Sequence, residues 1–156
     1  MSLFEEAKIA YEIVRRKDLS SEESRDLDAA IEARESAYAP YSKFLVGASI
    51  RSNSGEVVTG WNAENIVHHS LHAEENAIGN LSAAAREAGI KRVVIVGGLL
   101  VGNHSYTSPC GGCRQKLMEF AGKDTDIIMS GTDGDMVKVK LQDLLPFGFF
   151  PAEVKK

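Results

Sequence analysis

Two short stretches of the sequence combine residue types that can ligate a metal and move protons. His72 and Glu74 stand at the start of Leu71–Asn80, a stretch that otherwise favours a helix. Cys110 and Cys113 are the only cysteines among the 156 residues, and they form one C-x-x-C unit. Such a unit alone is compatible with a redox dithiol, a metal site or an inert pair. The chemistry therefore depends on whether the histidine lies beside the two thiols.

Zinc accounts for this set of side chains better than a redox pair does. Zinc takes imidazole and thiolate ligands in a tetrahedron, and a catalytic zinc keeps three protein ligands and one open position. His72, Cys110 and Cys113 supply three donors. Two thiolates balance the charge of the ion, which leaves Glu74 free to act as a base. The residue types thus predict a catalytic zinc site.

Both ligand groups are expected where helices begin. Pro109 precedes Cys110, and proline is favoured in the first turn of a helix, where the dipole and the free N–H groups favour a thiolate. His72 and Glu74 are two residues apart, so inside a helix they would point in nearly opposite directions. They can act together only at a helix start. In open α/β sheets, ligands bind at the edge where such helices begin.

Apolar patterning predicts the elements that position these residues. Helices are expected over residues 3–16, 20–39, 72–88 and 110–120, and strands over 44–50, 56–61, 92–96, 126–129 and 136–140. Strands that alternate with helices imply parallel pairing in the middle of the sheet, and flanking hairpins make the sheet mixed. Val137 and Val139 alternate with lysines, which suits an edge strand.

We therefore expect an α/β fold, a three-layer α/β/α sandwich with a mixed five-stranded sheet. Residues 1–20 are expected to add an N-terminal helix to a single catalytic domain over 21–156. The net charge of −4 and the absence of basic runs argue against a nucleic-acid partner. No apolar stretch is long enough to cross a bilayer, and the N-terminus lacks the apolar core of a signal peptide. We expect no membrane partner and a cytoplasmic location.

The motif residues resemble those of the zinc-dependent cytidine deaminases. An H-x-E segment followed by P-C-x-x-C is the known signature of zinc deaminases. The segments that carry the resemblance are His72–Glu74, Pro109–Gln115, Ala37–Ala48, Gly60–Asn65 and Leu144–Pro146. The resemblance covers roughly residues 24–151. It implies the small homotetrameric type of the family, with a variant like blasticidin S deaminase as the alternative.

The resemblance implies a role for each residue of the zinc site. His72, Cys110 and Cys113 would hold one zinc per subunit, and water would fill the fourth position. Glu74 would carry protons during the hydrolytic deamination of cytidine or 2′-deoxycytidine to uridine or 2′-deoxyuridine. Ammonia would be released, and the reaction would belong to pyrimidine salvage. The partner implied is a small nucleoside.

The resemblance also implies the substrate contacts. Phe44 would pack against the pyrimidine, Asn62 and Glu64 would bind the ribose hydroxyls, and Ala73 would be a further contact within the motif. One aromatic residue of the tail would reach the site of a neighbouring subunit, and the candidates are Phe147, Phe149 and Phe150. The alternative for single residues is that Phe44 belongs to the core and the two polar residues to an ordinary loop, and we favour the substrate roles over it.

Several departures from the family pattern leave the substrate open. Many small members have cysteine where His72 stands and arginine where Glu75 stands. Ile66–Ser70 replaces a stretch that usually holds small residues and a tyrosine, and the Phe-rich tail also differs. A modified cytosine nucleoside such as blasticidin S is the second hypothesis. The third is a nucleic-acid base deaminase, and the fourth is a non-enzymatic zinc-stabilised module in which Glu74 would be dispensable.

Overall fold

The computed structural model describes residues 8–67, 69–102 and 106–149. Within these ranges six strands form one sheet in the order β1-β6-β5-β4-β2-β3. The strands are β1 (Tyr11–Arg15), β2 (Phe44–Ser52), β3 (Val57–Trp61), β4 (Ile90–Leu99), β5 (Ala121–Ser130) and β6 (Asp135–Lys140). The helices are η1 (Arg16–Asp18, a 3₁₀ turn), α1 (Ser21–Glu35), α2 (Ala73–Asn80), α3 (Ala83–Ala88), α4 (Gly111–Met118) and α5 (Leu141–Leu144). None of the helices in these ranges could cross a bilayer.

The direction of the strands brings two helix starts to one edge of the sheet. β4 and β5 are parallel, as predicted for the middle of the sheet, and all other neighbours are antiparallel. Because β2 is antiparallel to both β3 and β4, those two strands run in the same direction. α2 follows β3 and α4 follows β4, so both helices begin at the edge where their strands end. Phe44, at the start of β2, pairs with Leu99 and lies at that edge as well.

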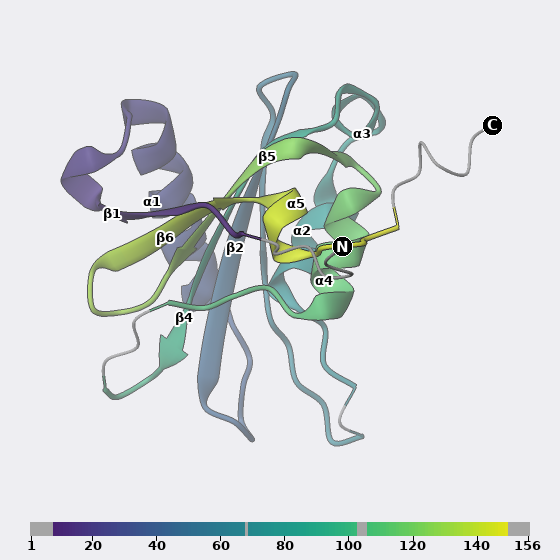
Figure 1. Ribbon diagram of the computed structural model, residues 1–156. Coiled ribbons are helices and arrows are strands. Elements are labelled where there is room, and N and C mark those ends of the chain that lie inside the picture. Colours follow the sequence, from purple (N-terminus) through teal and green to yellow (C-terminus); the bar gives the residue numbers. More distant parts are fainter. Residues whose placement is uncertain (1–7, 68, 103–105, 150–156) are drawn as a thin grey trace, which may run out of the picture.

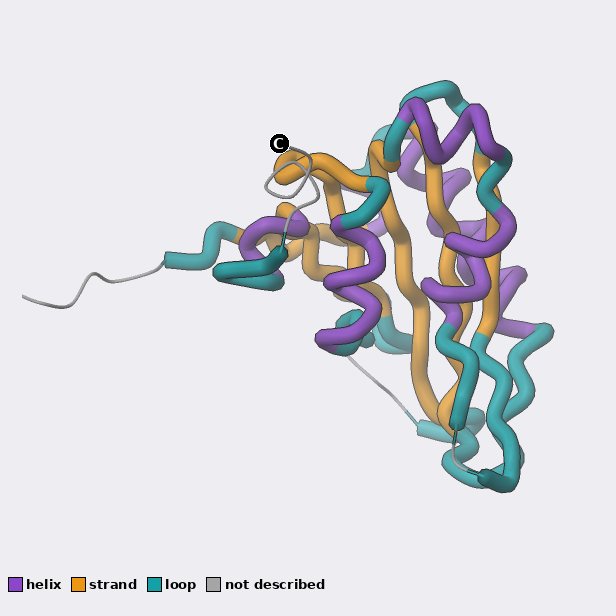
Figure 2. Tube along the Cα trace, turned by 90° about the vertical axis from the view of Figure 1, so that its right-hand side faces the viewer, coloured by secondary structure: helices purple, strands orange, loops and turns teal. Residues whose placement is uncertain are grey.

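The sheet is covered on both faces, which confirms the three-layer architecture (Figure 1). α1 packs Leu27 and Ala30 against Val94 and other apolar residues of one face. The opposite face, which includes Val93, packs against α2, α3, α4 and α5. Figure 2 looks onto this second face, with α2, α3 and α4 in front of the strands. Neighbouring residues of a strand point to opposite faces, so Val93 and Val94 serve different layers.

The N-terminal segment corrects two predictions. Where the segment is described, Tyr11–Arg15 is a strand, so the predicted helix is wrong there and the sheet has six strands rather than five. Val14 packs with the α1 layer, while Tyr11 and Ile13 lie on the other face opposite Val139 and Val137. This alternation with a period of two, in residues that favour strands, outweighs a helical spacing over few residues. Residues 1–7 lie outside the described ranges.

A third prediction is also wrong. β6 is not an edge strand, because β1 pairs with it on the side opposite β5. The lysines that suggested an edge are paired with acidic groups instead. Lys138 donates to Glu23 of α1 at 2.7 Å, and Lys140 donates to Asp126 of β5 at 2.7 Å. Lys138 and Lys140 are two residues apart in the strand, so both side chains lie on one face of the sheet, where both also approach Asp126. The alternating lysines of this strand therefore mark ion pairs rather than an edge.

The single helix predicted over residues 72–88 is two helices. Leu81 leaves the helical region with ψ of 131°, and Ser82 caps α3 by accepting a hydrogen bond from the N–H of Ala85 at 3.1 Å. Ser82 is itself held by Glu56, which accepts its N–H and its hydroxyl. The break keeps α2 short, so that its buried residues and those of α3 both reach the same core.

Gly60 of β3 sets how closely α2 approaches the sheet. A Cβ atom at this position would lie 2.3 Å from the backbone nitrogen of Ala77 and 2.4 Å from the carbonyl oxygen of Ala73. We expect Gly60→Ala to lower the free energy of unfolding by about 1–3 kcal/mol in a urea titration, because the helix must move away. Gly79→Ala is the control, because a Cβ atom there meets nothing within 4 Å. A Gly60→Ala protein as stable as the unmodified chain would contradict this account of how α2 is positioned.

Candidate active site

His72 is the residue that caps the start of α2. Its backbone is extended, with φ of −85° and ψ of 152°, and its N–H donates to the carboxylate of Glu75 at 3.0 Å. Because His72 lies just outside the helix, its side chain need not point away from that of Glu74. This confirms the prediction that the two residues stand at a helix start. Glu74 itself is buried in the first turn, with 4 % of its surface exposed.

Cys110 holds the corresponding position before α4 and caps this helix with its side chain. Its sulfur accepts a hydrogen bond from the N–H of Cys113 at 3.5 Å. The loop before it is fixed by Arg114, whose guanidinium donates to the carbonyl of Pro109 at 2.8 Å and to the hydroxyl of Ser108 at 2.7 Å. Cys110 is exposed and Cys113 is buried. One sulfur thus faces the outside of the site while the other closes it from behind.

The three predicted ligands converge on one point. Nδ1 of His72 lies 3.4 Å from the sulfur of Cys110 and 3.4 Å from that of Cys113. All three donor atoms lie within 4.8 Å of one another. Tetrahedral zinc with ordinary bond lengths separates a nitrogen and a sulfur ligand by about 3.6 Å. The donor types and their spacing therefore fit zinc with one coordination position left open.

Burial governs the protonation of the groups behind the site. Burial raises the pKa of the Cys113 thiol, and the negative charge of Glu74 raises it further. For this cysteine, burial outweighs the stabilisation of a thiolate expected at a helix start. Burial also raises the pKa of Glu74 above that of an ordinary glutamate. Because thiols must lose their protons to ligate a metal, zinc binding here releases protons.

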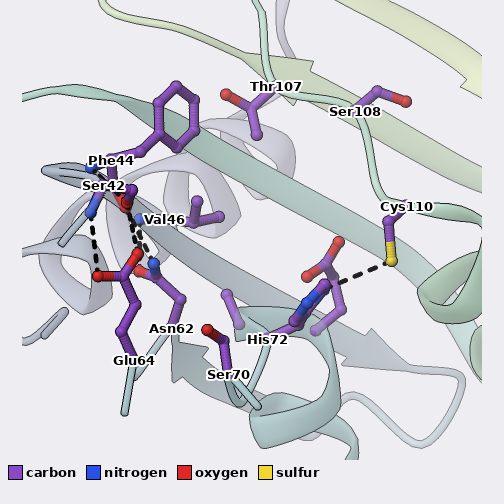
Figure 3. Close-up of a pocket in the computed structure, with 12 residues that line it drawn as sticks. Ser42, Phe44, Val46, Asn62, Glu64, Ser70, His72, Thr107, Ser108 and Cys110 are labelled. Carbon is purple, nitrogen blue, oxygen red and sulfur yellow. Dashed lines mark hydrogen bonds between the residues drawn. The ribbon is translucent and has the colours of Figure 1, made fainter. Parts of the chain in front are cut away.

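The ligands form one end of a cavity of about 280 Å³, and the predicted substrate residues form the other end (Figure 3). Phe44, Asn62 and Glu64 lie opposite His72 and Cys110 in this view. The residues that line the cavity are Ser42, Phe44, Val46, Asn62, Glu64, Ser70, His72, Ala73, Glu74, Thr107, Ser108 and Cys110. The structure thus gathers every predicted site residue here except Cys113, which lies behind the lining, and the tail aromatics.

Asn62 and Glu64 are held in place by backbone groups. The amide of Asn62 donates to the carbonyl of Phe44 at 2.9 Å and accepts the N–H of Val46 at 2.8 Å. Glu64 accepts the backbone N–H of Ser42 at 3.2 Å and also its hydroxyl. The Ser42 hydroxyl is the main group that lowers the pKa of Glu64. Glu64 therefore presents an ionised carboxylate at the cavity wall.

The unusual stretch Ile66–Ser70 lies mostly outside the cavity, and only part of it lines the cavity. Ala63 and Leu71 pair across its base through two backbone hydrogen bonds of 2.9 Å. Ile66 and Val67 are about three-quarters exposed, and Ser70 lines the cavity. His68 lies outside the described residues. Within the described part of this stretch, only Ser70 can influence the substrate directly.

The tail aromatics do not line this cavity in the described chain. Phe147 and Phe149 are exposed, and Phe150 lies outside the described residues. The side-chain amide of Gln115 in α4 holds the backbone of Phe149, donating to its carbonyl at 2.7 Å and accepting its N–H at 3.1 Å. The tail is thus attached to the helix that carries both cysteines.

Several residues that line the cavity or support it were not predicted. Ser42 orients Glu64, and Thr107 carries a buried hydroxyl with no hydrogen-bond partner among the described residues. Arg114 was noted only as part of the motif, although it fixes the loop that ends at Cys110. Serine and threonine in loops are too common to signal a role without the fold. Arg114, next to a ligand, was the one residue whose position could have drawn attention.

The model of the cytidine and deoxycytidylate deaminase zinc-binding region matches residues 20–130. A cytidine deaminase of Halalkalibacterium halodurans is 36% identical over 124 residues, which cover 80% of this chain and 90% of that protein.

Solved structures agree in fold. The crystal structure of cytidine deaminase from Burkholderia pseudomallei superposes with a TM-score of 0.69 at 32% identity, covering 80% of this chain and 97% of that one. The enzyme from Mycobacterium leprae gives a TM-score of 0.64 at 35% identity, covering 78% and 95%.

Proposed function

This chain belongs to the cytidine deaminase family and contains its zinc-binding region, and on that premise we propose that it hydrolyses the 4-amino group of free cytidine and 2′-deoxycytidine. The products would be uridine or 2′-deoxyuridine and ammonia. One observation carries the proposal. A buried carboxylate, Glu74, lines the same cavity as His72, whose Nδ1 lies 3.4 Å from both sulfurs.

The chain supplies a proton carrier and a place for a nucleophile. His72, Cys110 and Cys113 would hold zinc, which would make a water molecule acidic enough to act as a nucleophile near neutral pH. Glu74 takes up a proton from that water and delivers it to ring N3 as the oxygen attacks C4. Glu74 then takes the proton of the new hydroxyl group on C4 and delivers it to the amino group, so that the C4 carbonyl forms, the C4–N bond breaks and ammonia leaves. A carboxyl group whose pKa is raised by burial is suited to give protons as well as take them.

The far end of the cavity supports a neutral nucleoside as substrate. Phe44 offers an apolar ring for the pyrimidine, and Asn62 and Glu64 offer polar groups for ribose hydroxyls. None of the described lining residues is a lysine or arginine, and Glu64 is held ionised. A phosphate group would meet a carboxylate here without a cation to balance it. This disfavours nucleotides and the backbone of nucleic acids as substrates.

Ammonia release against a panel of substrates tests the proposal. We expect kcat/KM for cytidine and 2′-deoxycytidine to exceed that for cytidine monophosphate and blasticidin S by at least about tenfold. A lost or repulsive charged contact costs about this much or more in binding. Free cytosine should also react poorly, because it lacks the ribose contacts of Asn62 and Glu64.

Two results of the panel would reject the proposal. A preference for blasticidin S would favour the modified-nucleoside hypothesis. Turnover of single-stranded DNA or RNA, weakened by added salt, would favour the nucleic-acid hypothesis. Zinc content is measured on the same sample, so that an inactive preparation can be traced to missing metal.

We propose further that the chain assembles as a homotetramer in the cytoplasm. Tyr11, Ile13 and Tyr106 are 61%, 61% and 48% exposed around a hollow of about 670 Å³, an apolar surface suited to a second copy. Both cysteines are free thiols, the state that a reducing compartment preserves. Sedimentation equilibrium should give the mass of four chains, and Ile13→Glu should lower it. A single-chain mass for the unmodified protein at micromolar concentration would contradict the tetramer.

A further inference from the structure

Glu75 connects the two helices that carry the zinc ligands. One of its carboxylate oxygens accepts the N–H of His72 at 3.0 Å. The other forms an ion pair with the ammonium group of Lys116 in α4. A single carboxylate thus joins the backbone of one ligand to the helix that holds both of the others.

The sequence spacing of the pair reflects its position. Glu75 follows His72 by three residues, and Lys116 follows Cys113 by three residues. Residues three apart lie on the same face of a helix. Each member of the pair therefore lies one turn beyond a ligand, on the sides of α2 and α4 that face each other.

The exposure of the pair indicates a role other than general stabilisation. The side chains of Lys116 and Glu75 are 56% and 21% exposed, and ion pairs this accessible contribute little to folding. Zinc binding requires a more exact relative position of α2 and α4 than folding does. His72 comes from one helix and both sulfurs from another, so a small relative shift of α2 and α4 changes both 3.4 Å separations at once.

We propose that Glu75 and Lys116 form a positioning pair that keeps His72 aligned with Cys110 and Cys113 and thereby slows the loss of zinc. Glu75 contributes in two ways, since it holds the backbone of His72 and attracts α4. Lys116 contributes only through the ion pair. The pair touches neither substrate nor zinc, and its effect passes through the ligands.

The rate of zinc release to a chromogenic chelator tests the proposal, with thermal unfolding of the zinc-free protein measured in parallel. Glu75→Ala removes both contacts and should speed zinc release on the order of tenfold, as loss of groups that orient metal ligands does. Lys116→Met removes the ion pair alone and should change the rate in the same direction by less. Glu75→Gln keeps an oxygen that can accept the N–H of His72, and its release rate should fall between that of Glu75→Ala and that of the unmodified protein.

Lys140→Met provides a matched control. It removes an ion pair with Asp126 in which the side chains are 43% and 21% exposed, on strands away from the zinc ligands. Its zinc release should match that of the unmodified protein even if its zinc-free form unfolds at a lower temperature. The proposal is overturned if Glu75→Ala and Lys116→Met release zinc at the unmodified rate, whatever their stability. Should Glu75→Ala not fold, the rates of Lys116→Met and Glu75→Gln decide. The measurement uses no substrate, so it stands apart from which nucleoside the protein deaminates.

Discussion

Glu74→Gln is expected to lower kcat by roughly 10²–10⁴-fold while the protein keeps one zinc per chain, the loss typical of removing a general acid–base group. Glutamine has nearly the same shape, so the buried side chain of Glu74 can be replaced without opening a cavity. It cannot accept a proton from water and return it to the leaving amine. Stopped assays of ammonia release, together with metal analysis of the same sample, give the two quantities needed.

Glu87→Gln is the matched control for this substitution. Glu87 is exposed on α3, outside the residues that line the cavity, and its replacement should leave kcat unchanged. A Glu74→Gln protein that turns over cytidine at a rate close to that of the control would refute the role given to this carboxylate. It would favour the hypothesis of a zinc-stabilised module, in which Glu74 serves stability alone.

Substitution of the histidine ligand should have the second largest effect. We expect His72→Ala to reduce the zinc content from about one per chain to nearly none, and turnover with it, because two sulfurs remain of three ligands. The variant should also unfold at a lower temperature than the zinc-loaded protein. A ligand present at a thousand times its dissociation constant stabilises the native state by about 4 kcal/mol, and that contribution disappears.

His69→Ala controls for the general effect of removing a histidine. His69 is exposed in the loop before α2, and its contacts with Asn65 are made by backbone atoms. Zinc content, turnover and unfolding temperature should all stay as in the unmodified protein. Full zinc content in His72→Ala would mean that the metal is held by other residues, and the three-ligand site would then be wrong.

The zinc site could be predicted because its residues lie in two short segments of the sequence. His72 and Glu74 are neighbours in sequence, as are Cys110 and Cys113, and each group coincides with signals for the start of a helix. The order of strands and helices then placed both starts at one edge of the sheet. Before the structure, two arguments indicated that the two groups bind the same metal: the number of zinc donors and the family resemblance. The structure supplies the 3.4 Å separations that no pattern of residues contains.

The predictions that failed concern partners distant in the chain. Tyr11–Arg15 becomes a strand by pairing with Asp135–Lys140, more than a hundred residues away, and a short segment carries little of that information. The break at Leu81 arises because α2 and α3 must both reach one core. The contact between Glu75 and Lys116 depends on how α2 lies against α4. From the sequence alone, Glu75 stands out only as a departure from the arginine of many family members.

Anomalous diffraction from crystals of the purified protein, collected at the zinc absorption edge, tests the central claim most directly. The account predicts one strong peak per chain, about 2.0–2.1 Å from Nδ1 of His72 and about 2.3 Å from the sulfurs of Cys110 and Cys113, with a light atom in the fourth position beside Glu74. A disulfide between the two cysteines with no peak near them would contradict it. So would a zinc ion closed off by a fourth protein ligand, because no position would then remain for the water that attacks the substrate.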